Sequence, residues 1–81
     1  MFHKIKSVKP LDDLSILVEF DNDIEKVYDI KQLIEKWPIF KELYDQTLFK
    51  QVKVDPGGHG VLWNDDIDLS CNEIWENGMV I

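Results

Sequence analysis

Arginine and alanine are both missing from this 81-residue chain, and hydroxyl and thiol side chains are few. Without arginine the chain has no planar guanidinium with which to grip a phosphate or to read a guanine edge. Sixteen acidic residues against nine lysines leave a net charge of −7, which repels nucleic-acid backbones at long range. Direct nucleic-acid binding is therefore not expected.

Long apolar runs are also missing. No uncharged stretch approaches the roughly 18 to 20 residues that a membrane helix needs, and Met1–Lys4 is not followed by the apolar stretch of a secretion signal. The single cysteine, Cys71, can form neither an internal disulfide nor a cysteine-based metal site, which agrees with a reducing compartment. These absences predict a cytoplasmic protein that makes no contact with a membrane.

Patterns that carry catalysis are equally scarce. No serine or threonine lies in a glycine-flanked elbow or beside a histidine, and Cys71 has no base near it in the sequence. His59 lies in the glycine-rich segment Pro56–Gly60, which lacks the Lys-Ser/Thr of a phosphate-binding loop and is typical of a hairpin turn. We therefore expect a protein that is not an enzyme, with no catalytic residues.

Metal patterns are incomplete as well. The segments Asp21–Asp23 and Asn64–Asp66 are rich in oxygen ligands, but neither has the glycine and the bidentate glutamate of a calcium loop. The separations of His3, His59 and Cys71 match no compact zinc pattern. We expect turns at both acidic segments, and neither a metal site nor a cofactor site.

Apolar residues make up 44% of the chain, enough for one folded domain spanning residues 1–81. Leu14 to Phe20 alternate between apolar and polar, and the alternation resumes at Ile24, Tyr28 and Ile30. A three-residue loop at Asp21–Asp23 would put these apolar residues on one face, at the cost of placing Glu19 opposite Glu25. Burial outweighs one charge pair, so we predict this register, with Asp23 in the left-handed conformation.

The remaining segments predict short elements. Residues 3–9 indicate a strand closed by Pro10, and Asp29 with Gln32 matches the capping pattern of a helix. Pro38 ends that helix and begins a second one. A second hairpin over 50–63, a brief strand at 67–69 and a capping box at 70–73 follow. The predicted fold is therefore α+β: an antiparallel sheet of two hairpins plus an N-terminal strand, with short helices between the hairpins and at the C-terminus.

Large apolar side chains remain that a small core can leave exposed. Three tryptophans are many for this length, and most of them are expected in the core. The segment Met79, Val80 and Ile81 either returns to the sheet as a strand or offers an apolar surface to another chain. We predict that these three residues and Trp75 bind a partner.

The order and spacing of several elements resemble a known family. The elements are Ile5–Pro10, Leu14 to Phe20 with its Asp21–Asp23 turn, Tyr28–Ile30 with Leu33 and Ile34, Phe40 with Leu43, Phe49 before Val52 and Val54, and Asp55, Gly60, Val61 and Trp63 before Asp68 and Leu69. In these positions, from about Ile5 to Trp75, the chain is similar to the bacterial family called domain of unknown function 2442. That family usually carries Asp-Gly at the first turn, where this chain has Asp23.

The resemblance implies a small bacterial α+β domain with no established activity and no catalytic motif. It also implies a partner protein encoded nearby, in an arrangement suggestive of toxin and antitoxin pairs, and some family members carry a helix-turn-helix that this chain lacks. One hypothesis is therefore a noncatalytic protein-binding module, antitoxin-like, for a basic partner. The alternative is a small-molecule or metal-binding domain using His59 and the acidic turns. A homodimer through paired edge strands or through residues 79–81 is a third possibility.

Overall fold

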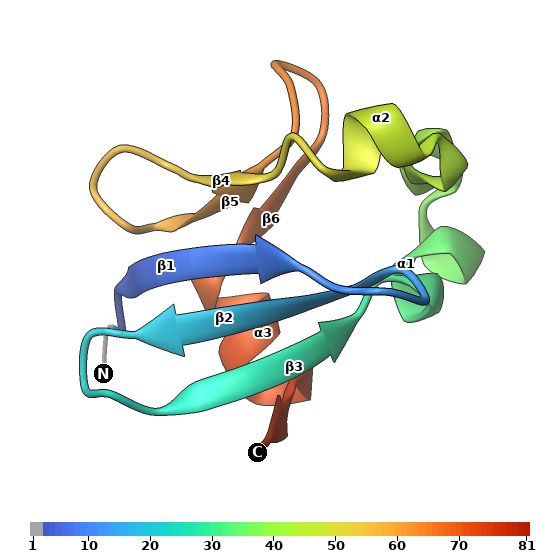
Figure 1. Cartoon of the computed structure of the whole chain (residues 1–81). Coiled ribbons are helices and arrows are strands. Elements are labelled where there is room, and N and C mark those ends of the chain that lie inside the picture. Colours follow the sequence, from blue (N-terminus) through green and yellow to red (C-terminus); the bar gives the residue numbers. More distant parts are fainter. Residues whose placement is uncertain (1–2) are drawn as a thin grey trace.

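The computed structural model describes residues 3–81 and shows two antiparallel sheets with short helices between them (Figure 1). The four-stranded sheet has the order β1-β2-β3-β7, formed by β1 (Ile5–Pro10), β2 (Ser15–Phe20), β3 (Glu25–Asp29) and β7 (Met79–Val80). The three-stranded sheet contains β4 (Lys53–Val54), β5 (Gly60–Leu62) and β6 (Asp68–Ser70) in that order. The predicted α+β class is confirmed, but the two hairpins belong to separate sheets and do not share one.

The first hairpin has the predicted register. Glu19 lies opposite Glu25, and Asp23 has a φ of 68°, the left-handed conformation required by the three-residue loop. The expected burial of Ile24 is wrong, because this residue precedes β3 and its side chain is 36% exposed. Lys26, which has the same parity along the strand, is buried in its place.

A buried lysine at Lys26 is explained by contacts from the other end of the chain. Its Nζ donates a hydrogen bond to the carbonyl of Trp75 and lies 4.0 Å from the centroid of the Trp75 ring. Both contacts favour a cation, which offsets the cost of removing the ammonium from water. The inner face of β3 is therefore completed by a residue whose position in the alternation faces inward but whose charge alone would favour solvent.

Three short helices connect the sheets. They are α1 (Lys31–Lys36), the 3-10 helix η1 (Pro38–Tyr44) and α2 (Gln46–Phe49). The Asp29 carboxylate accepts from the backbone N–H of Lys31, but α1 begins one residue later than the capping pattern predicts, with Ile30 and not Asp29 at the N-cap. Pro38 begins η1, as predicted. The α2 helix is not among the predicted elements. The strand predicted from Lys50 is also shorter than expected, because β4 contains only Lys53 and Val54. Asp45 caps α2 by accepting from the N–H of Thr47.

The three-stranded sheet lies against β1 through its glycine-rich turn. The N–H of Ile5 donates to the carbonyl of Gly58 at 2.8 Å, and Gly58 has a φ of 74°. A Cβ on Gly58 would lie 2.9 Å from the Ile5 carbonyl oxygen, closer than real Cβ atoms come. Only glycine lets this turn approach β1, so the Pro56–Gly60 segment is a hairpin turn with a packing role.

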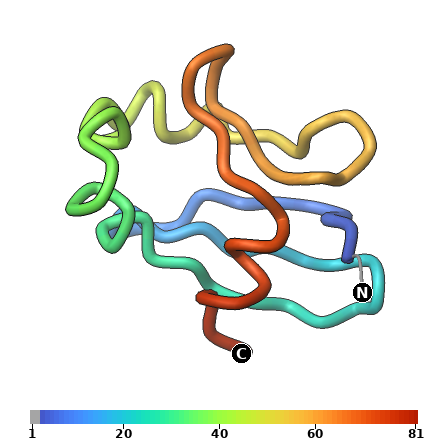
Figure 2. Tube along the Cα trace, turned by 180° about the vertical axis from the view of Figure 1, so that it is seen from behind, coloured from blue at the N-terminus to red at the C-terminus, as the bar shows by residue number. Residues whose placement is uncertain are grey.

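The last helix, α3 (Cys71–Asn77), crosses the rear face of the four-stranded sheet (Figure 2). The Ser70 hydroxyl accepts from the N–H of Glu73 at 3.1 Å, as the capping box predicts. Gly78 ends the helix, and the chain then forms β7 beside β3. No helix within residues 3–81 has the length and apolar character needed to cross a membrane.

One apolar core lies between the two sheets and the helices. It includes completely buried residues of both hairpins and of the helices: Ile16, Val18, Phe20, Tyr28, Ile30, Leu33, Leu43, Phe49, Val61, Ile67 and Ile74. Of the three tryptophans, only Trp63 is fully buried, and its Nε1 donates to the carbonyl of Phe49 at 3.1 Å. Trp75 is half-buried and Trp37 is exposed, so the prediction that most tryptophans belong to the core is only partly right.

Candidate functional site

Residues 79–81, which are predicted to bind a partner, return to the sheet as a strand and also expose an apolar surface. Met79 and Val80 return to the sheet as β7, opposite Val27 and Lys26, and yet their side chains stay exposed, 76% in the case of Met79. Ile81 is also exposed, and its N–H donates to the carbonyl of Glu25. The segment is therefore an edge strand with apolar side chains on its surface.

Trp75 does not belong to that surface. Its ring stacks on His3 with the centroids 3.6 Å apart and meets Phe20 edge-on at 4.9 Å. Lys26 also lies over the ring, with its Nζ 4.0 Å from the centroid. These contacts give half-buried Trp75 a packing role, and its binding of a partner stays a prediction.

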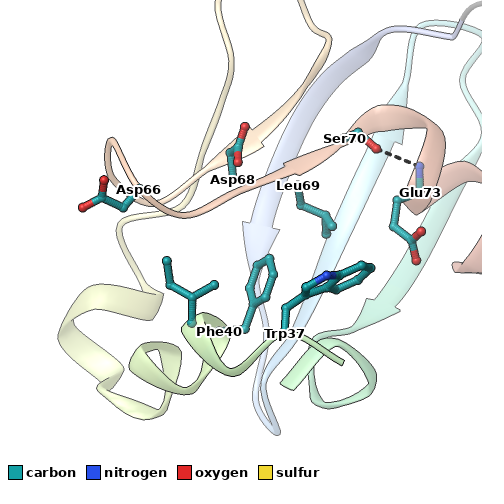
Figure 3. A pocket seen from close by; sticks show the side chains of 8 residues that line it. Trp37, Phe40, Asp66, Asp68, Leu69, Ser70 and Glu73 are labelled. Carbon is teal, nitrogen blue, oxygen red and sulfur yellow. Dashed lines mark hydrogen bonds between the residues drawn. The ribbon is translucent and has the colours of Figure 1, made fainter. Parts of the chain in front are cut away.

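A different surface has the features of a binding site. A cleft of about 340 Å³ lies between η1 and β6, lined by Trp37, Ile39, Phe40, Asp66, Asp68, Leu69, Ser70 and Glu73 (Figure 3). In this view Leu69 points from β6 toward Trp37 and Phe40, while Asp66 and Glu73 lie near opposite ends. Trp37 is 49% exposed and Ile39 44% exposed, so a large apolar area faces water there.

The exposure of Trp37 follows from the proline behind it. A residue before proline is driven out of the α region, and Trp37 is extended, with φ −131° and ψ 101°. Its position between α1 and η1 turns the indole away from the core that Leu33 and Ile34 enter. Phe40, one turn later, packs edge-on against Trp63 with the centroids 6.5 Å apart, which fixes the floor of the cleft to the buried core.

The opposite wall is fixed by side-chain hydrogen bonds to the backbone. The side-chain Oδ1 of Asn64 accepts from the backbone N–H groups of Asp66 and Ile67, both at 2.9 Å, and so holds the turn that leads into β6. Ser70 caps α3 at the other end of the strand. The acidic residues of the cleft therefore stand on a constrained backbone.

The cleft is negatively charged, and no lysine within residues 3–81 forms an ion pair with its carboxylates. The ion pairs within residues 3–81 use Lys6 and Lys31, and none of them includes Asp66, Asp68 or Glu73. The Glu73 carboxylate accepts from the Tyr28 hydroxyl at 2.8 Å, and burial together with this carboxylate raises the pKa of Tyr28. Carboxylates at the two ends of an apolar floor, with Asp68 on the face of β6 opposite to Leu69, form a surface suited to a side chain with an apolar stem and a cationic head.

His59 lies in a second, smaller cleft of about 210 Å³, which also contains Asp55 and Asp68. Within residues 3–81, no three or more His, Cys, Asp or Glu side chains are grouped so that they could hold a metal ion. The Cys71 thiol is buried and donates to the His3 carbonyl, and burial, followed by the charge of Asp21, raises the pKa of the thiol. A raised pKa disfavours the thiolate that a nucleophile needs.

The sequence analysis places Asp66 in a turn and Asp68 in a brief strand, and it misses the cleft. One available signal was the alternation of Asp66 and Asp68 with Ile67 and Leu69, which predicts a strand with one acidic face. The other was a tryptophan immediately before Pro38. What the sequence could not supply was the approach of two segments about thirty residues apart along the chain.

Comparison with protein families gives one match, which covers nearly the whole chain. The family described as "Protein of unknown function (DUF2442)" matches residues 5–79. No curated protein and no solved structure matches the chain.

Proposed function

Because the chain belongs to the DUF2442 family of proteins of unknown function, we propose from its own surface that it is a noncatalytic module that binds a basic protein partner. The observation that carries this proposal is the cleft between η1 and β6, in which exposed Trp37 and Ile39 adjoin carboxylates that form no ion pair within residues 3–81. The net charge of −7 supports it, since a negative surface speeds the approach of a basic partner.

The location and the biological role are finer parts of the same proposal. We place the protein in the bacterial cytoplasm and regard it as an antitoxin-like neutraliser of a basic protein encoded beside it. Co-expression tests this role: a toxic neighbour should stop growth alone and should not do so together with this chain. Equal growth in both cases would contradict the antitoxin role and leave the binding role in place.

The binding role is tested by capture from the native cell with tagged variants. Trp37→Ala should lose a stoichiometric basic partner that the unaltered protein retains, because the variant removes most of the exposed floor. Tyr44→Ala is the matched control, since Tyr44 is an exposed aromatic of the same η1 helix that does not line the cleft.

A third variant separates the cleft from the C-terminal surface. Met79→Ser removes an exposed apolar side chain of β7 and leaves its backbone pairing with β3 available. If Met79→Ser abolishes capture and Trp37→Ala does not, the partner binds at residues 79–81 and the cleft is not the site. The association rate should also fall as salt rises, since screening weakens attraction between exposed charges.

The second candidate function is small-molecule or metal binding; the smaller cleft lined by His59, Asp55 and Asp68 favours a small molecule, whereas these three side chains are not grouped closely enough to hold a metal ion. It predicts that zinc, manganese or calcium raises the melting temperature by mass action. A His59→Ala variant should then lose the increase. An unchanged melting temperature with all three metals would contradict metal binding.

A further inference from the structure

The free edge of β6 forms one wall of the acidic cleft. In the three-stranded sheet, β6 pairs with β5 on one side only. Backbone hydrogen bonds join Trp63 to Ile67 and His59 to Cys71. Hydrogen-bonded and non-hydrogen-bonded pairs alternate along an antiparallel ladder, so the pair between these two, Val61 and Leu69, is also hydrogen-bonded. The backbone groups of Asp68, between them, therefore point away from β5.

These edge groups have no partner within residues 3–81. No backbone hydrogen bond outside the β5–β6 ladder uses the N–H or the carbonyl of Asp68, or the N–H of Ser70. Both residues line the cleft, across from Trp37 and Ile39. The cleft thus offers a short row of backbone donors and acceptors beside an exposed apolar floor, the combination by which a sheet edge accepts an added strand.

We propose that the cleft binds an extended segment of the basic partner as a fourth strand beside β6, a mode that rests on the proposed function. A residue of this segment opposite Asp68 exchanges two hydrogen bonds with it, and a third bond uses the N–H of Ser70. The segment's side chains then alternate between the face of Asp68 and the face of Leu69, which points toward the floor.

The alternation specifies the chemistry of the segment. The residue opposite Asp68 should be lysine or arginine, since it shares a face with that carboxylate. The residues on either side of this cation should be apolar, because they face Trp37, Phe40 and Leu69. Lys36 Nζ, 6.0 Å from the Trp37 ring centroid, is at the outer limit of a cation–π contact and leaves the ring available.

The mode is tested by titrating the 15N-labelled protein with a capped pentapeptide of alternating valine and lysine. We expect shifts of the Asp68 and Ser70 amides and slower exchange of both with solvent. The same peptide with N-methylated backbone amides on its pairing edge keeps every side chain, and it should bind at least about tenfold more weakly, because it cannot donate to the edge. Equal affinity of the two peptides would overturn strand addition.

Two variants of the chain give the reciprocal test. Asp68→Pro removes an N–H that points away from β5, a position where proline is compatible with an edge strand, and it should abolish peptide binding. Asp68→Asn keeps the N–H and loses only the charge, so it should weaken binding by no more than about fivefold. If Asp68→Asn is as damaging as Asp68→Pro, charge attraction and not strand addition accounts for the site.

The capture experiment distinguishes failure of this mode from failure of the proposed function. A partner that is lost with Trp37→Ala but retained at full strength with Asp68→Pro would overturn strand addition and leave the basic-partner function intact. A partner retained by both variants would overturn strand addition and the cleft as the binding site, and capture of no basic partner by the unaltered protein would overturn the proposed function itself. The amide NMR spectrum of each 15N-labelled variant, compared with that of the unaltered protein, shows whether the three-stranded sheet is still formed.

Discussion

The two sheets of this protein depend on different kinds of interaction. In the four-stranded sheet, β2 pairs with a strand on each side over most of its six residues, and its alternate side chains are buried. In the three-stranded sheet, β5 pairs through two residues on one side and three on the other. The first sheet is stabilised by many backbone pairs along its strands, whereas the second depends on a few close backbone contacts at glycines, where a Cβ would collide.

The largest effect should come from Gly60→Ala, which tests those close contacts. A Cβ at Gly60 would collide with the carbonyl oxygen of Leu69 and lie 3.2 Å from the Ser70 Cα, and these are backbone atoms of the paired strand. We expect a loss of about 3 kcal/mol of unfolding free energy, measured in guanidinium, in a single transition because the sheets share one core.

Gly57→Ala is the graded control for that variant. Its φ of 98° is unfavourable for alanine, but its nearest contact is the flexible His59 side chain, so we expect a cost of about 1 kcal/mol. Equal losses for the two variants would show that the β5–β6 spacing is not the constraint. Two separate transitions in Gly60→Ala would show that the sheets fold independently.

Hydrogen exchange should separate the sheets without any substitution. We expect the Val18 amide in β2 to exchange at least about tenfold more slowly than the Val61 amide in β5, which corresponds to about 1.4 kcal/mol of opening free energy. Both side chains are buried, so the difference reports the number of flanking backbone pairs. Equal protection would contradict the contrast between long and short ladders.

Tyr28→Phe tests the attachment of α3 to the four-stranded sheet. The variant loses the hydroxyl bond to Glu73, so we expect a loss of about 1 kcal/mol at pH 7. Burial and Glu73 raise the pKa of Tyr28, so the folded protein keeps a proton that an unfolded tyrosine releases near pH 10. This contribution is complete below about pH 10 and is lost as pH rises above it.

The pH dependence provides its own control. The difference in stability between the unaltered protein and Tyr28→Phe, measured by urea unfolding, should shrink as the pH rises from about 10 to about 11. Tyr44→Phe alters an exposed tyrosine and should leave the stability unchanged at neutral pH. A difference that is constant across this range would show that the Tyr28 hydroxyl is not held in its neutral form by folding.

The smallest effect should be a gain in the first hairpin. Asp23 has a φ of 68°, a conformation that glycine adopts without steric cost, so Asp23→Gly should stabilise the protein by about 0.5 kcal/mol. The exposed ion pair of Asp23 with Lys6, at 3.1 Å, offsets little of this gain. Thermal unfolding measures the change, and a lower melting temperature would show that the ion pair outweighs the turn conformation.

The contrast between the sheets also explains how much the sequence alone could predict. The register of β2 and β3 was predictable because seven apolar residues agree on one face and a single like-charge pair opposes them. The exchange of Ile24 for Lys26 was not predictable, because the contacts that bury Lys26 come from Trp75, 49 residues away. Short strands such as β4 carry too few residues to show a period.

The candidate site follows the same rule. The capping of α3 and the turn at Asn64 could be predicted, because each depends on residues within four positions of one another. The cleft could not, since it exists only where η1 approaches β6. The side chains of Met79, Val80 and Ile81 are exposed, as a partner-binding surface requires. The stacking of Trp75 on His3 could not be predicted, because the two residues are far apart in the sequence and leave no local signal.

The buried amine of Lys26 can report how often α3 separates from the four-stranded sheet. The chain has nine lysines, and Lys26 is only 8% exposed. Its amine contacts the Trp75 carbonyl and ring, so an acylating reagent reaches it only when α3 separates from β3. The other amines can be modified first, while the fold is intact. The rate at which Lys26 is acetylated, followed by mass spectrometry, would therefore time the opening of the C-terminal helix in the unaltered protein.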